Sequence, residues 1–407
     1  MEQERKIRVA ITHGDTNAVG YEVIFKAFED PTMLELCTPI IYGSAKIATY
    51  HAKALGVEPQ FTIINKAEDA HEGRLNLLNV FNDEAKIELG QATHEAGEYA
   101  IKALDRALND YSNGAFDVLV TAPVSKNTIS GFNGHTAYIT QQLADNSQGL
   151  TILLSEELRV ALVTNNVAIK DLSEAITKQK IIDKARIFHN ALRRDLRISS
   201  PRIAVLGLNP RCGDDGILGD EEQEVIKPAV NELEAEGIQA FGPYSADDFF
   251  GNIDYVKFDG VLAMYHDQGQ TPFKALAKDE GVRYTAGLKL VRTAPTQGPS
   301  FELAGRNMVD ACSFRHAIFY AIDIFRNRQN YDEPLSNPLP KLYHEKRDES
   351  EKVRFRSGNN ERNTDRNNER NNSRSNERSN DHNVAGEGHD SGSRQNTHGA
   401  SQKPTEE

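Results

Sequence analysis

The sequence predicts an α/β protein with a mostly parallel sheet, and three observations support this prediction. Short β-rich runs alternate with helical patterns along most of the chain, as in folds built from strand–helix–strand units. The clearest helical pattern covers residues 96–111 and stops at Gly114, with apolar residues at helical spacing on one stripe. Residues 1–345 also exceed the size at which single cores usually split, so we expect two α/β lobes with a ligand cleft between them.

Each predicted element follows from a local pattern. Runs rich in aliphatic and β-branched residues predict strands at residues 7–11, 39–42, 61–64, 118–120, 151–154, 159–163, 202–208 and 261–265. Further helical patterns begin at about Tyr21, follow Thr177, cover 225–233 before Gly237, and run through 314–325. Helices between the strands would cover the sheet and bury their apolar stripes against it.

The last 62 residues differ from the body. Residues 346–407 contain 11 Asn, 12 Lys+Arg and 12 Asp+Glu, but only Val353, Phe355 and Val384 as sizeable apolar residues. Such a segment buries too little surface to offset its chain entropy, so we predict a disordered tail.

Charge and hydropathy exclude several classes of protein. The charges of the tail cancel, so the net charge of −13 belongs to the body, where 35 basic groups face 48 acidic ones. An acidic body argues against nucleic acid as a partner. The apolar runs fall far short of the roughly 20 residues of a membrane span, and without a signal-peptide layout we expect a cytoplasmic protein. Cys37, Cys212 and Cys312 are odd in number and widely separated, which predicts reduced thiols.

Five polar regions follow predicted strands, where open α/β sheets bind ligands. They are residues 12–20, 121–126 with 134–136, 164–166, 208–216 and 264–269. The first is a helix-entry turn or an anion loop, and it lacks the second glycine of a dinucleotide fingerprint. In the second, Lys126, His135 and Thr136 could hold a phosphate or carboxylate, or could be a solvated lysine and an ordinary turn.

The last two regions also allow two interpretations. Arg211 lies in a glycine-rich loop that suits anion binding, although exposed arginines are usually only solvated. His266 directly follows an apolar strand, with Lys274 and Arg292 downstream. This grouping is harder to explain as surface decoration, but a single histidine is a metal ligand, a proton carrier or a structural residue.

Together and in this order, these segments resemble the 4-hydroxythreonine-4-phosphate dehydrogenase family of vitamin B6 biosynthesis. The resemblance spans about residues 7–330 and is most specific at 121–126, 134–136, 207–210 and 264–269. It implies two α/β/α lobes of the isocitrate and isopropylmalate dehydrogenase type, a central cleft, and a homodimer with shared active sites. The cofactor-side lobe would be 1–130 plus 295–345, and the substrate and dimerisation lobe 131–294.

The resemblance also implies a reaction. Family members oxidise 4-phosphooxy-L-threonine with NAD or NADP, and the β-keto acid then loses carbon dioxide to give 3-amino-2-oxopropyl phosphate. A divalent metal (zinc, magnesium, manganese or cobalt) would lower the pKa of the alcohol and stabilise the enolate. The residues that would bind the phosphorylated substrate are His135, Thr136, Lys274, Arg283 and Arg292. The catalytic set would be Lys274, Arg211 and Asp247, the last of these reaching over from the partner subunit.

The metal positions depart from the family pattern. Three histidines hold the metal in the family, and the matching residues here are Asn166, Arg211 and His266. Asparagine offers a weak amide oxygen, and arginine has no lone pair to donate and repels a cation. The sequence therefore predicts a degraded metal site in which His266 remains. The cofactor-side loop at 292–299 is altered too, so cofactor-binding residues and the choice between NAD and NADP stay open.

These departures leave three hypotheses. The first is a dehydrogenase of this family, or of a related phosphorylated hydroxy acid, in which Arg211 takes the place of the metal and stabilises the alkoxide or enolate. The second is a catalytically impaired homologue that binds a phosphorylated ligand or has a regulatory role. The third is RNA binding by the tail, against which its zero net charge and single aromatic residue, Phe355, argue.

Overall fold

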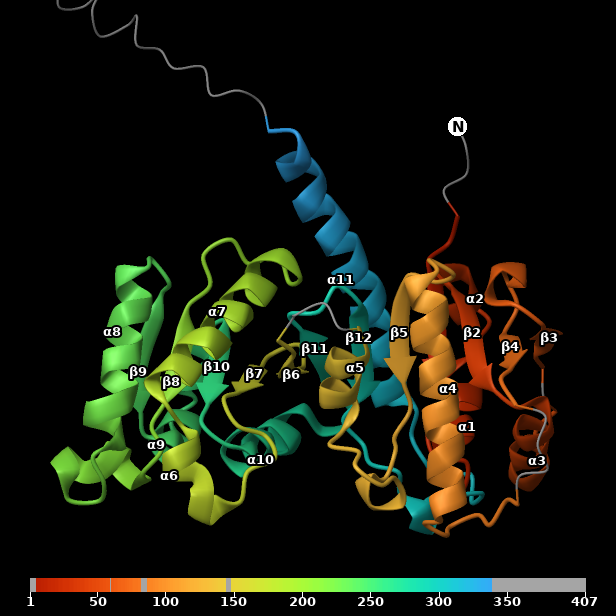
Figure 1. Cartoon of the computed structure of the whole chain (residues 1–407), viewed down its shortest axis with the longest axis horizontal. Helices are drawn as coiled ribbons and strands as arrows, with labels where there is room; N and C mark the ends of the chain where they lie inside the picture. Colours follow the sequence, from red (N-terminus) through yellow and green to blue (C-terminus); the bar gives the residue numbers. More distant parts are fainter. Residues whose placement is uncertain (1–4, 59, 82–85, 144–147, 339–407) are drawn as a thin grey trace, which may run out of the picture. The chain divides into compact units, whose positions relative to one another are not determined.

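The computed structural model describes residues 5–58, 60–81, 86–143 and 148–338, which lie in one compact unit. The predicted tail at 346–407 lies outside the described residues. A single 12-stranded sheet runs through the unit, with helices on both of its faces (Figure 1). The predicted class, a mostly parallel α/β fold, is confirmed.

The strands are β1 (Arg8–Thr12), β2 (Thr38–Gly43), β3 (Thr62–Ile64), β4 (Asn76–Asn79), β5 (Val118–Thr121), β6 (Leu150–Leu154), β7 (Arg159–Leu162), β8 (Ile203–Leu206), β9 (Ala240–Tyr244), β10 (Gly260–Ala263), β11 (Val282–Ala286) and β12 (Val291–Pro295). The α-helices are α1 (Gly20–Ala27), α2 (Met33–Leu36), α3 (Ala45–Leu55), α4 (His94–Ser112), α5 (His135–Leu143), α6 (Leu172–Ala175), α7 (Lys178–Arg194), α8 (Lys227–Ala235), α9 (Ala246–Gly251), α10 (His266–Ala277) and α11 (Cys312–Ser336).

The strand order is β3-β4-β2-β1-β5-β12-β11-β6-β7-β10-β8-β9. The pairings from β3 to β12 and from β7 to β9 are parallel, whereas β12·β11, β11·β6 and β6·β7 are antiparallel. Sheet twist accumulates across these central strands. As a result the arrowheads of β5 and β10 point to the same side (Figure 1), and the carboxyl ends of strands from both halves meet there.

Local sequence explains the long helices. Thr93 caps α4, its hydroxyl accepting a hydrogen bond from the Ala96 amide at 3.3 Å, and Thr177 caps α7 in the same way through Lys180. Both helices bury the predicted apolar stripe. Strands β4, β9, β11 and β12 were not predicted, because β4 begins and ends with asparagine and β11 and β12 carry arginine and threonine.

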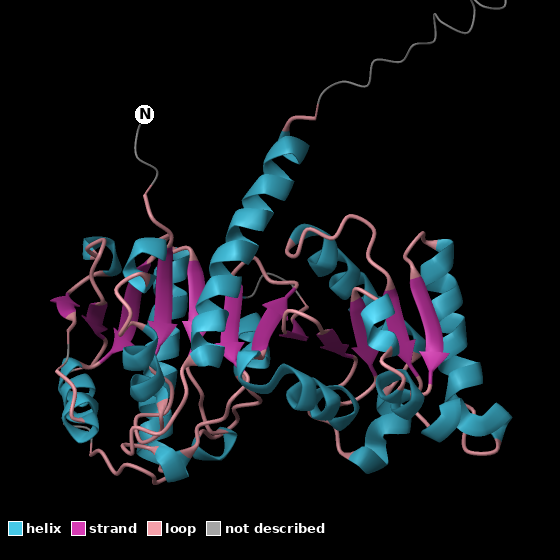
Figure 2. Cartoon of the chain, turned by 180° about the vertical axis from the view of Figure 1, so that it is seen from behind, coloured by secondary structure: helices cyan, strands magenta, loops and turns pink. Residues whose placement is uncertain are grey.

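The core is continuous on one face of the sheet and divided on the other. One cluster of buried apolar residues extends from Val9 to Ile324 along the whole unit. On the other face, one cluster around Leu104 and Leu119 lies under α4, and another around Phe249 and Phe273 lies under α9 and α10. The division into lobes at residues 130/131 and 294/295 stays a prediction. Figure 2 shows the same sheet from behind, with α11 crossing its centre.

Among the described helices, none combines the length and the apolar composition that a membrane span requires.

Candidate functional site

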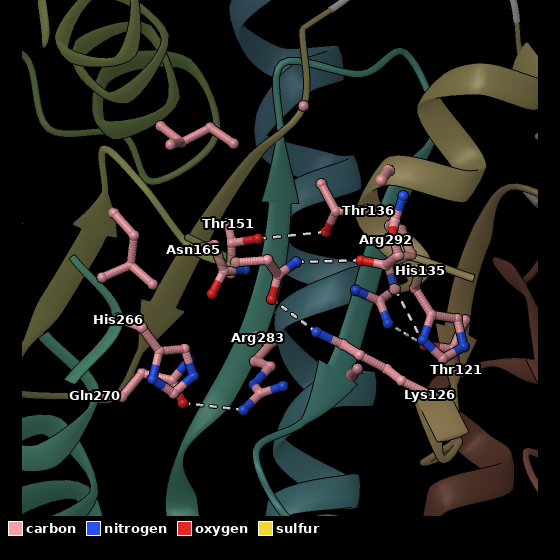
Figure 3. A pocket seen from close by; sticks show the side chains of 18 of the residues that line it. Thr121, Lys126, His135, Thr136, Thr151, Asn165, His266, Gln270, Arg283 and Arg292 are labelled. Carbon is pink, nitrogen blue, oxygen red and sulfur yellow. Dashed lines mark hydrogen bonds between the residues drawn. The ribbon is translucent and has the colours of Figure 1, made fainter. Parts of the chain in front are cut away.

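A cavity of about 760 Å³ lies at the carboxyl ends of β5, β7, β10 and β12. Its walls are the segments that follow these strands, the amino end of α5, and side chains of α10 and β11 (Figure 3). Three of the five predicted polar regions therefore meet in one place: 121–126 with 134–136, 164–166, and 264–269.

The charged side chains of this cavity all have the same sign. Six basic residues line it, and no aspartate or glutamate is found among the described residues of its wall. The six are Lys126, Lys180, Lys184, Lys274, Arg283 and Arg292. Like charges that lie close together repel one another, so the cavity favours an anionic ligand.

Arg292 of β12 is the most deeply buried of these cations, with 5% of its surface exposed. Its guanidinium donates hydrogen bonds to two neutral hydroxyls, from Nε to Thr121 Oγ1 at 3.1 Å and from a terminal nitrogen to Thr285 Oγ1 at 3.2 Å. Burial, and then the charge of Arg283, lower the pKa of Arg292 to about 9. A bound anion would supply the compensating charge that these hydroxyls cannot.

Arg283 approaches the cavity from β11. It donates one hydrogen bond to Gln270 Oε1 at 3.0 Å, while its Nε is buried and has no hydrogen-bond partner within the described structure. Lys274 lies one turn after Gln270 on α10, and burial followed by the charge of Arg283 lowers the pKa of Lys274. An orphaned buried donor beside a second cation is the arrangement that a carboxylate or phosphate would complete.

The amino end of α5 forms the opposite wall. His135 and Thr136 are its first residues, where unpaired amides and the helix dipole favour an anion. Burial, Arg292 and Arg283 hold the pKa of His135 well below its ordinary value, so its imidazole is neutral. The Thr136 hydroxyl lies 3.2 Å from Thr285 Oγ1 and 3.3 Å from Thr151 Oγ1, which ties the helix to the central strands.

The first polar segment, residues 12–20, is buried and does not line the cavity. Its Asp15 amide donates to Pro123 O at 3.1 Å, and its Asp15 carboxyl lies 3.4 Å from the Thr128 hydroxyl. A Cβ atom on Gly14, whose φ is +75°, would lie 2.4 Å from Pro123 O, so only glycine permits this approach. The segment therefore supports the loop that carries Lys126.

The three metal positions do not form one donor set in this chain. His266 lines the cavity with Nδ1 2.6 Å from Asp267 Oδ1, and Asn166 lines it with Oδ1 accepting a hydrogen bond from Lys126 Nζ at 2.7 Å. Arg211 lies outside the wall, largely exposed and 3.0 Å from Asp214. Nowhere in the described part of the chain are three or more His, Cys, Asp or Glu side chains placed to hold a metal ion. These residues do not fit a divalent cation.

Asp247 also lies outside the cavity, at the start of α9, where it accepts a hydrogen bond from Ser245 at 2.5 Å. That bond, backbone amides and the nearby charge of Arg211 lower the pKa of Asp247. The structure thus brings His135, Thr136, Lys274, Arg283, Arg292, His266 and Asn166 together, and it leaves Arg211 and Asp247 outside. Their assigned roles remain predictions.

Several polar residues of the wall carry no signal in the sequence. Gln270, Lys180 and Lys184 lie on α10 and α7 with no motif around them, and the fold alone brings them in. Thr285 lies behind the wall, where it accepts a hydrogen bond from Arg292. It could have been found once β11 was recognised, because residues two apart on a strand share a face and Arg283 lines the cavity. The three cysteines are free thiols, as predicted.

Comparisons with known proteins agree on one family. The family model described as pyridoxal phosphate biosynthetic protein PdxA matches residues 35–321. The chain is 52% identical over 357 residues to the 4-hydroxythreonine-4-phosphate dehydrogenase of Bacteroides thetaiotaomicron, covering 87% of this chain and 98% of that protein. It is 35% identical to the enzyme of that name from Sulfurihydrogenibium sp., covering 79% of this chain and all of that one.

A solved structure agrees with these sequence matches. The crystal structure of 4-hydroxythreonine-4-phosphate dehydrogenase from Klebsiella pneumoniae superposes with a TM-score of 0.68 at 27% identity, covering 79% of this chain and 99% of that one. The resemblance seen in the polar motifs is therefore confirmed, and the chain belongs to the PdxA family.

Proposed function

We propose that this protein oxidises and decarboxylates 4-phosphooxy-L-threonine to 3-amino-2-oxopropyl phosphate in vitamin B6 biosynthesis, with NAD or NADP as hydride acceptor. The single observation that carries the proposal is the cavity whose charged wall residues are all basic, in a chain that belongs to the PdxA family. Such a wall complements a ligand that carries both a phosphate and a carboxylate.

The substrate-binding roles rest on charge and reach. Arg292 and Arg283 can each bind an oxyanion with two parallel N–H groups, and Lys274 adds a third positive charge from α10. The amino end of α5, with Thr136 and the neutral imidazole of His135, supplies donors on the other side. These five residues line one cavity, which supports their assignment to the phosphate and carboxylate of one molecule.

A nicotinamide cofactor fits the loop after β12. Residues 294–299 line the cavity, and the buried Gln297 Nε2 has no hydrogen-bond partner within the described structure. This loop and Gln297 would hold the cofactor, which accepts a hydride from the carbinol carbon when bound. The rest of the wall binds the substrate and keeps its carboxylate and phosphate in place during that transfer.

We also infer a homodimer that completes the site. Arg211 and Asp247 are exposed outside the cavity of their own chain. Arg211 begins a run of six residues with positive φ, four of which are not glycine, and such strain persists only where the surrounding structure holds it. Exposed apolar residues lie at this end of the sheet, among them Ile217, Phe241, Ile253 and Val256. Light scattering of the purified protein would test the dimer.

The experiment that tests the function is absorbance-monitored reduction of NAD and of NADP with 4-phosphooxy-L-threonine, with added divalent metal and with chelator. Reduction with release of carbon dioxide is the expected result. If 4-phosphooxy-L-threonine and related phosphorylated hydroxy acids all fail to reduce either cofactor, while a ligand still raises the melting temperature, the protein is a binding protein with the fold of an enzyme.

A further inference from the structure

The side chain of Asn166 is already bound by a cation of the protein itself, the ammonium group of Lys126. Asn166 Oδ1, the only good lone-pair donor of that amide, accepts the Lys126 ammonium at 2.7 Å, while its Nδ2 donates to Asn133 O at 3.2 Å. Both ends of the amide are thus engaged. A divalent cation on the same oxygen would lie against the ammonium and be repelled by it.

Lys126 and Asn166 are both exposed residues of the cavity wall, and the turn that carries Lys126 sets its position. Lys126 follows β5 and begins a short 3₁₀ turn, Lys126–Thr128, whose Thr128 hydroxyl donates to Ser125 O at 2.8 Å. Its side chain passes over Gly134, where an added Cβ would lie 3.4 Å from Cε and 3.9 Å from Nζ. In Figure 3 this side chain points toward the middle of the cavity, to the side on which His266 and Arg283 lie.

The ammonium also has capacity for a ligand. Lys126 makes no ion pair with a carboxylate in the described ranges, and the Asn166 bond uses one of its three N–H groups. Arg211, the other residue that could replace a metal charge, is turned away to Asp214. Lys126 is therefore the cation that this chain itself places beside Asn166 inside the cavity.

We propose that the Lys126 ammonium, oriented by Asn166, stabilises the negative charge that develops on the reacting oxygen of the substrate, and that the reaction needs no divalent metal. This inference rests on the proposed function. In the decarboxylation step the bond from the α-carbon to the carboxylate breaks and carbon dioxide leaves. The electron pair moves through the adjacent carbon–carbon bond to the ketone oxygen. Lys126 donates a hydrogen bond to the resulting enolate oxygen and keeps its proton, so atoms and charge balance.

Lys126 and Asn166 have different roles. Lys126 is a catalytic residue, because it touches the reacting oxygen. Asn166 is a positioning residue that acts through Lys126. A lysine that only bound the phosphate would affect KM, whereas a lysine that stabilises the enolate affects kcat and the fraction of keto acid that loses carbon dioxide.

The test uses the full-length protein with the variants Lys126→Met, Lys126→Arg and Asn166→Leu, and the exposed Lys66→Met as a matched control. Lys126→Met should lower kcat at least 100-fold with KM changed less than about fivefold. Carbon dioxide released per reduced cofactor should fall below one, with keto acid accumulating in the mass spectrum. Lys126→Arg should recover part of kcat, Asn166→Leu should lose about tenfold, and Lys66→Met should match the wild type. Circular dichroism confirms that each variant is folded.

Different results would overturn different statements. A rise in KM alone in Lys126→Met, or one carbon dioxide per reduced cofactor in that variant, would make Lys126 an anion-binding residue. Stoichiometric zinc, manganese or magnesium in the purified wild type, or activity lost to chelator and restored by metal, would overturn the metal-free site. A wild type that reduces no cofactor with any phosphorylated hydroxy acid would instead overturn the proposed function, and the catalytic role of Lys126 with it.

Discussion

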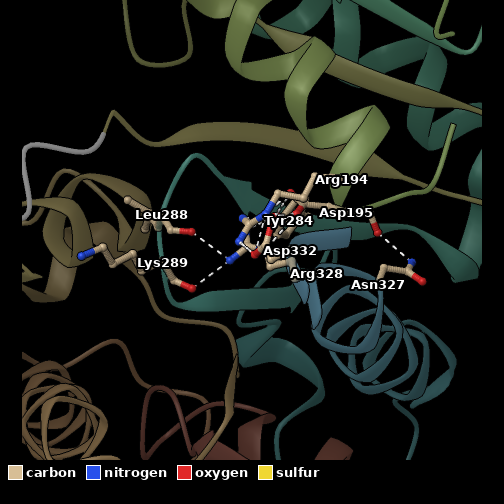
Figure 4. A network of polar contacts seen from close by, with 8 residues as sticks. All are labelled: Arg194, Asp195, Tyr284, Leu288, Lys289, Asn327, Arg328 and Asp332. Carbon is tan, nitrogen blue, oxygen red and sulfur yellow. Dashed lines mark hydrogen bonds and ion pairs between the residues drawn. The ribbon is translucent and has the colours of Figure 1, made fainter. Parts of the chain in front are cut away.

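Two buried arginines contact opposite faces of the central strands, and their surroundings differ in one respect. Arg328 of α11 is 6% exposed and donates to Asp195 Oδ1 at 2.7 Å, to the Tyr284 hydroxyl at 2.7 Å, and to two backbone carbonyls (Figure 4). Arg292 of β12 is buried to the same degree, yet it donates only to hydroxyls. One buried cation has its counter-charge within the chain, and the other lacks one among the described residues.

The alternation of β11 produces this contrast. Arg283 lines the cavity, and Thr285 on the same side of the strand accepts a hydrogen bond from Arg292, whereas Tyr284 between them faces α11 and its hydroxyl donates to Asp195 at 2.5 Å. The face toward α11, on which Arg328 is paired with Asp195, is charge-balanced and holds the long helix to the sheet. The face toward the cavity is unbalanced, because Arg292 and Arg283 have no carboxylate partner there among the described residues. Burying a charge without a partner is unfavourable, so the cavity face should reduce the free energy of unfolding of the ligand-free protein.

The largest expected effect comes from removing the unbalanced cation. Arg292→Met should lower kcat/KM by about 10³, equivalent to about 4 kcal/mol, because an oxyanion of the substrate loses its buried partner. The free energy of unfolding should not fall, since the change relieves repulsion with Arg283. Steady-state kinetics and urea unfolding on the same sample check both parts. A variant that keeps its activity and loses stability would contradict the comparison.

The balanced face should respond in the opposite way. Arg328→Met leaves the Asp195 carboxylate buried and unpaired, and we expect the free energy of unfolding to fall by about 3 kcal/mol, with KM nearly unchanged. Urea unfolding measures this. The control is Asp332→Asn, which breaks the half-exposed pair with Arg194 and should cost less than about 1 kcal/mol. Equal losses of unfolding free energy in the two variants would show that the buried Arg328 network stabilises the protein no more than the half-exposed pair does.

Ligand binding should stabilise only through the unbalanced face. Inorganic phosphate at 100 times its Kd should raise the stability of the wild type by about 2.7 kcal/mol through mass action, seen as a higher melting temperature. In Arg283→Gln the shift should be much smaller, while Asp332→Asn should keep it. A full shift in Arg283→Gln would place the phosphate elsewhere.

Buried histidines and a buried aspartate away from the cavity make the free energy of unfolding depend on pH. Burial, and for His13 the charge of His51, lower the pKa of His13 to about 3 and that of His51 to about 4, while burial raises the pKa of Asp15 to about 6. Between pH 7 and 5 the unfolded histidines bind protons that the folded ones do not, so stability falls. Asp15 binds its proton more readily when folded and returns part of that loss. For these three groups together the net loss should be about 2 kcal/mol at pH 5, and His135, whose pKa is also held well below its ordinary value, adds to it.

A substitution of His13 tests this dependence of the free energy of unfolding on pH. Both of its ring nitrogens are buried without a hydrogen-bond partner within the described structure, and the ring stacks on Tyr21 at 5.2 Å. His13→Phe should therefore fold and should remove about 2 kcal/mol of the pH-dependent loss between pH 7 and 5 in urea unfolding, while the losses from His51 and His135 remain. Replacing the exposed His94 with Gln should leave the slope as it is. An unchanged slope in His13→Phe would assign the loss to other groups.

Much of the fold could be predicted from local patterns. The eight predicted strands and the helices at α4, α7, α8 and α11 follow periodicities that each segment carries by itself. Three of the four missed strands carry polar residues: β4 begins and ends with asparagine, and β11 and β12 carry arginine and threonine. The fourth, β9, lies at the edge of the sheet and contains glycine and proline, which weaken the strand pattern. For such strands, tertiary pairing outweighs the local signal.

The sequence by itself determined the α/β class and the family, and it picked out five residues that line one cavity, His135, Thr136, Lys274, Arg283 and Arg292, since these depend on residue type and order along the chain. Only the tertiary structure decided which charges have partners. Sheet twist brings the ends of β5 and β10 to one side, the turn after β5 delivers Lys126 to Asn166, and the end of α7 supplies Asp195 to Arg328 of α11. Contacts between residues 40 or more positions apart depend on how the whole chain folds, and no local pattern encodes them.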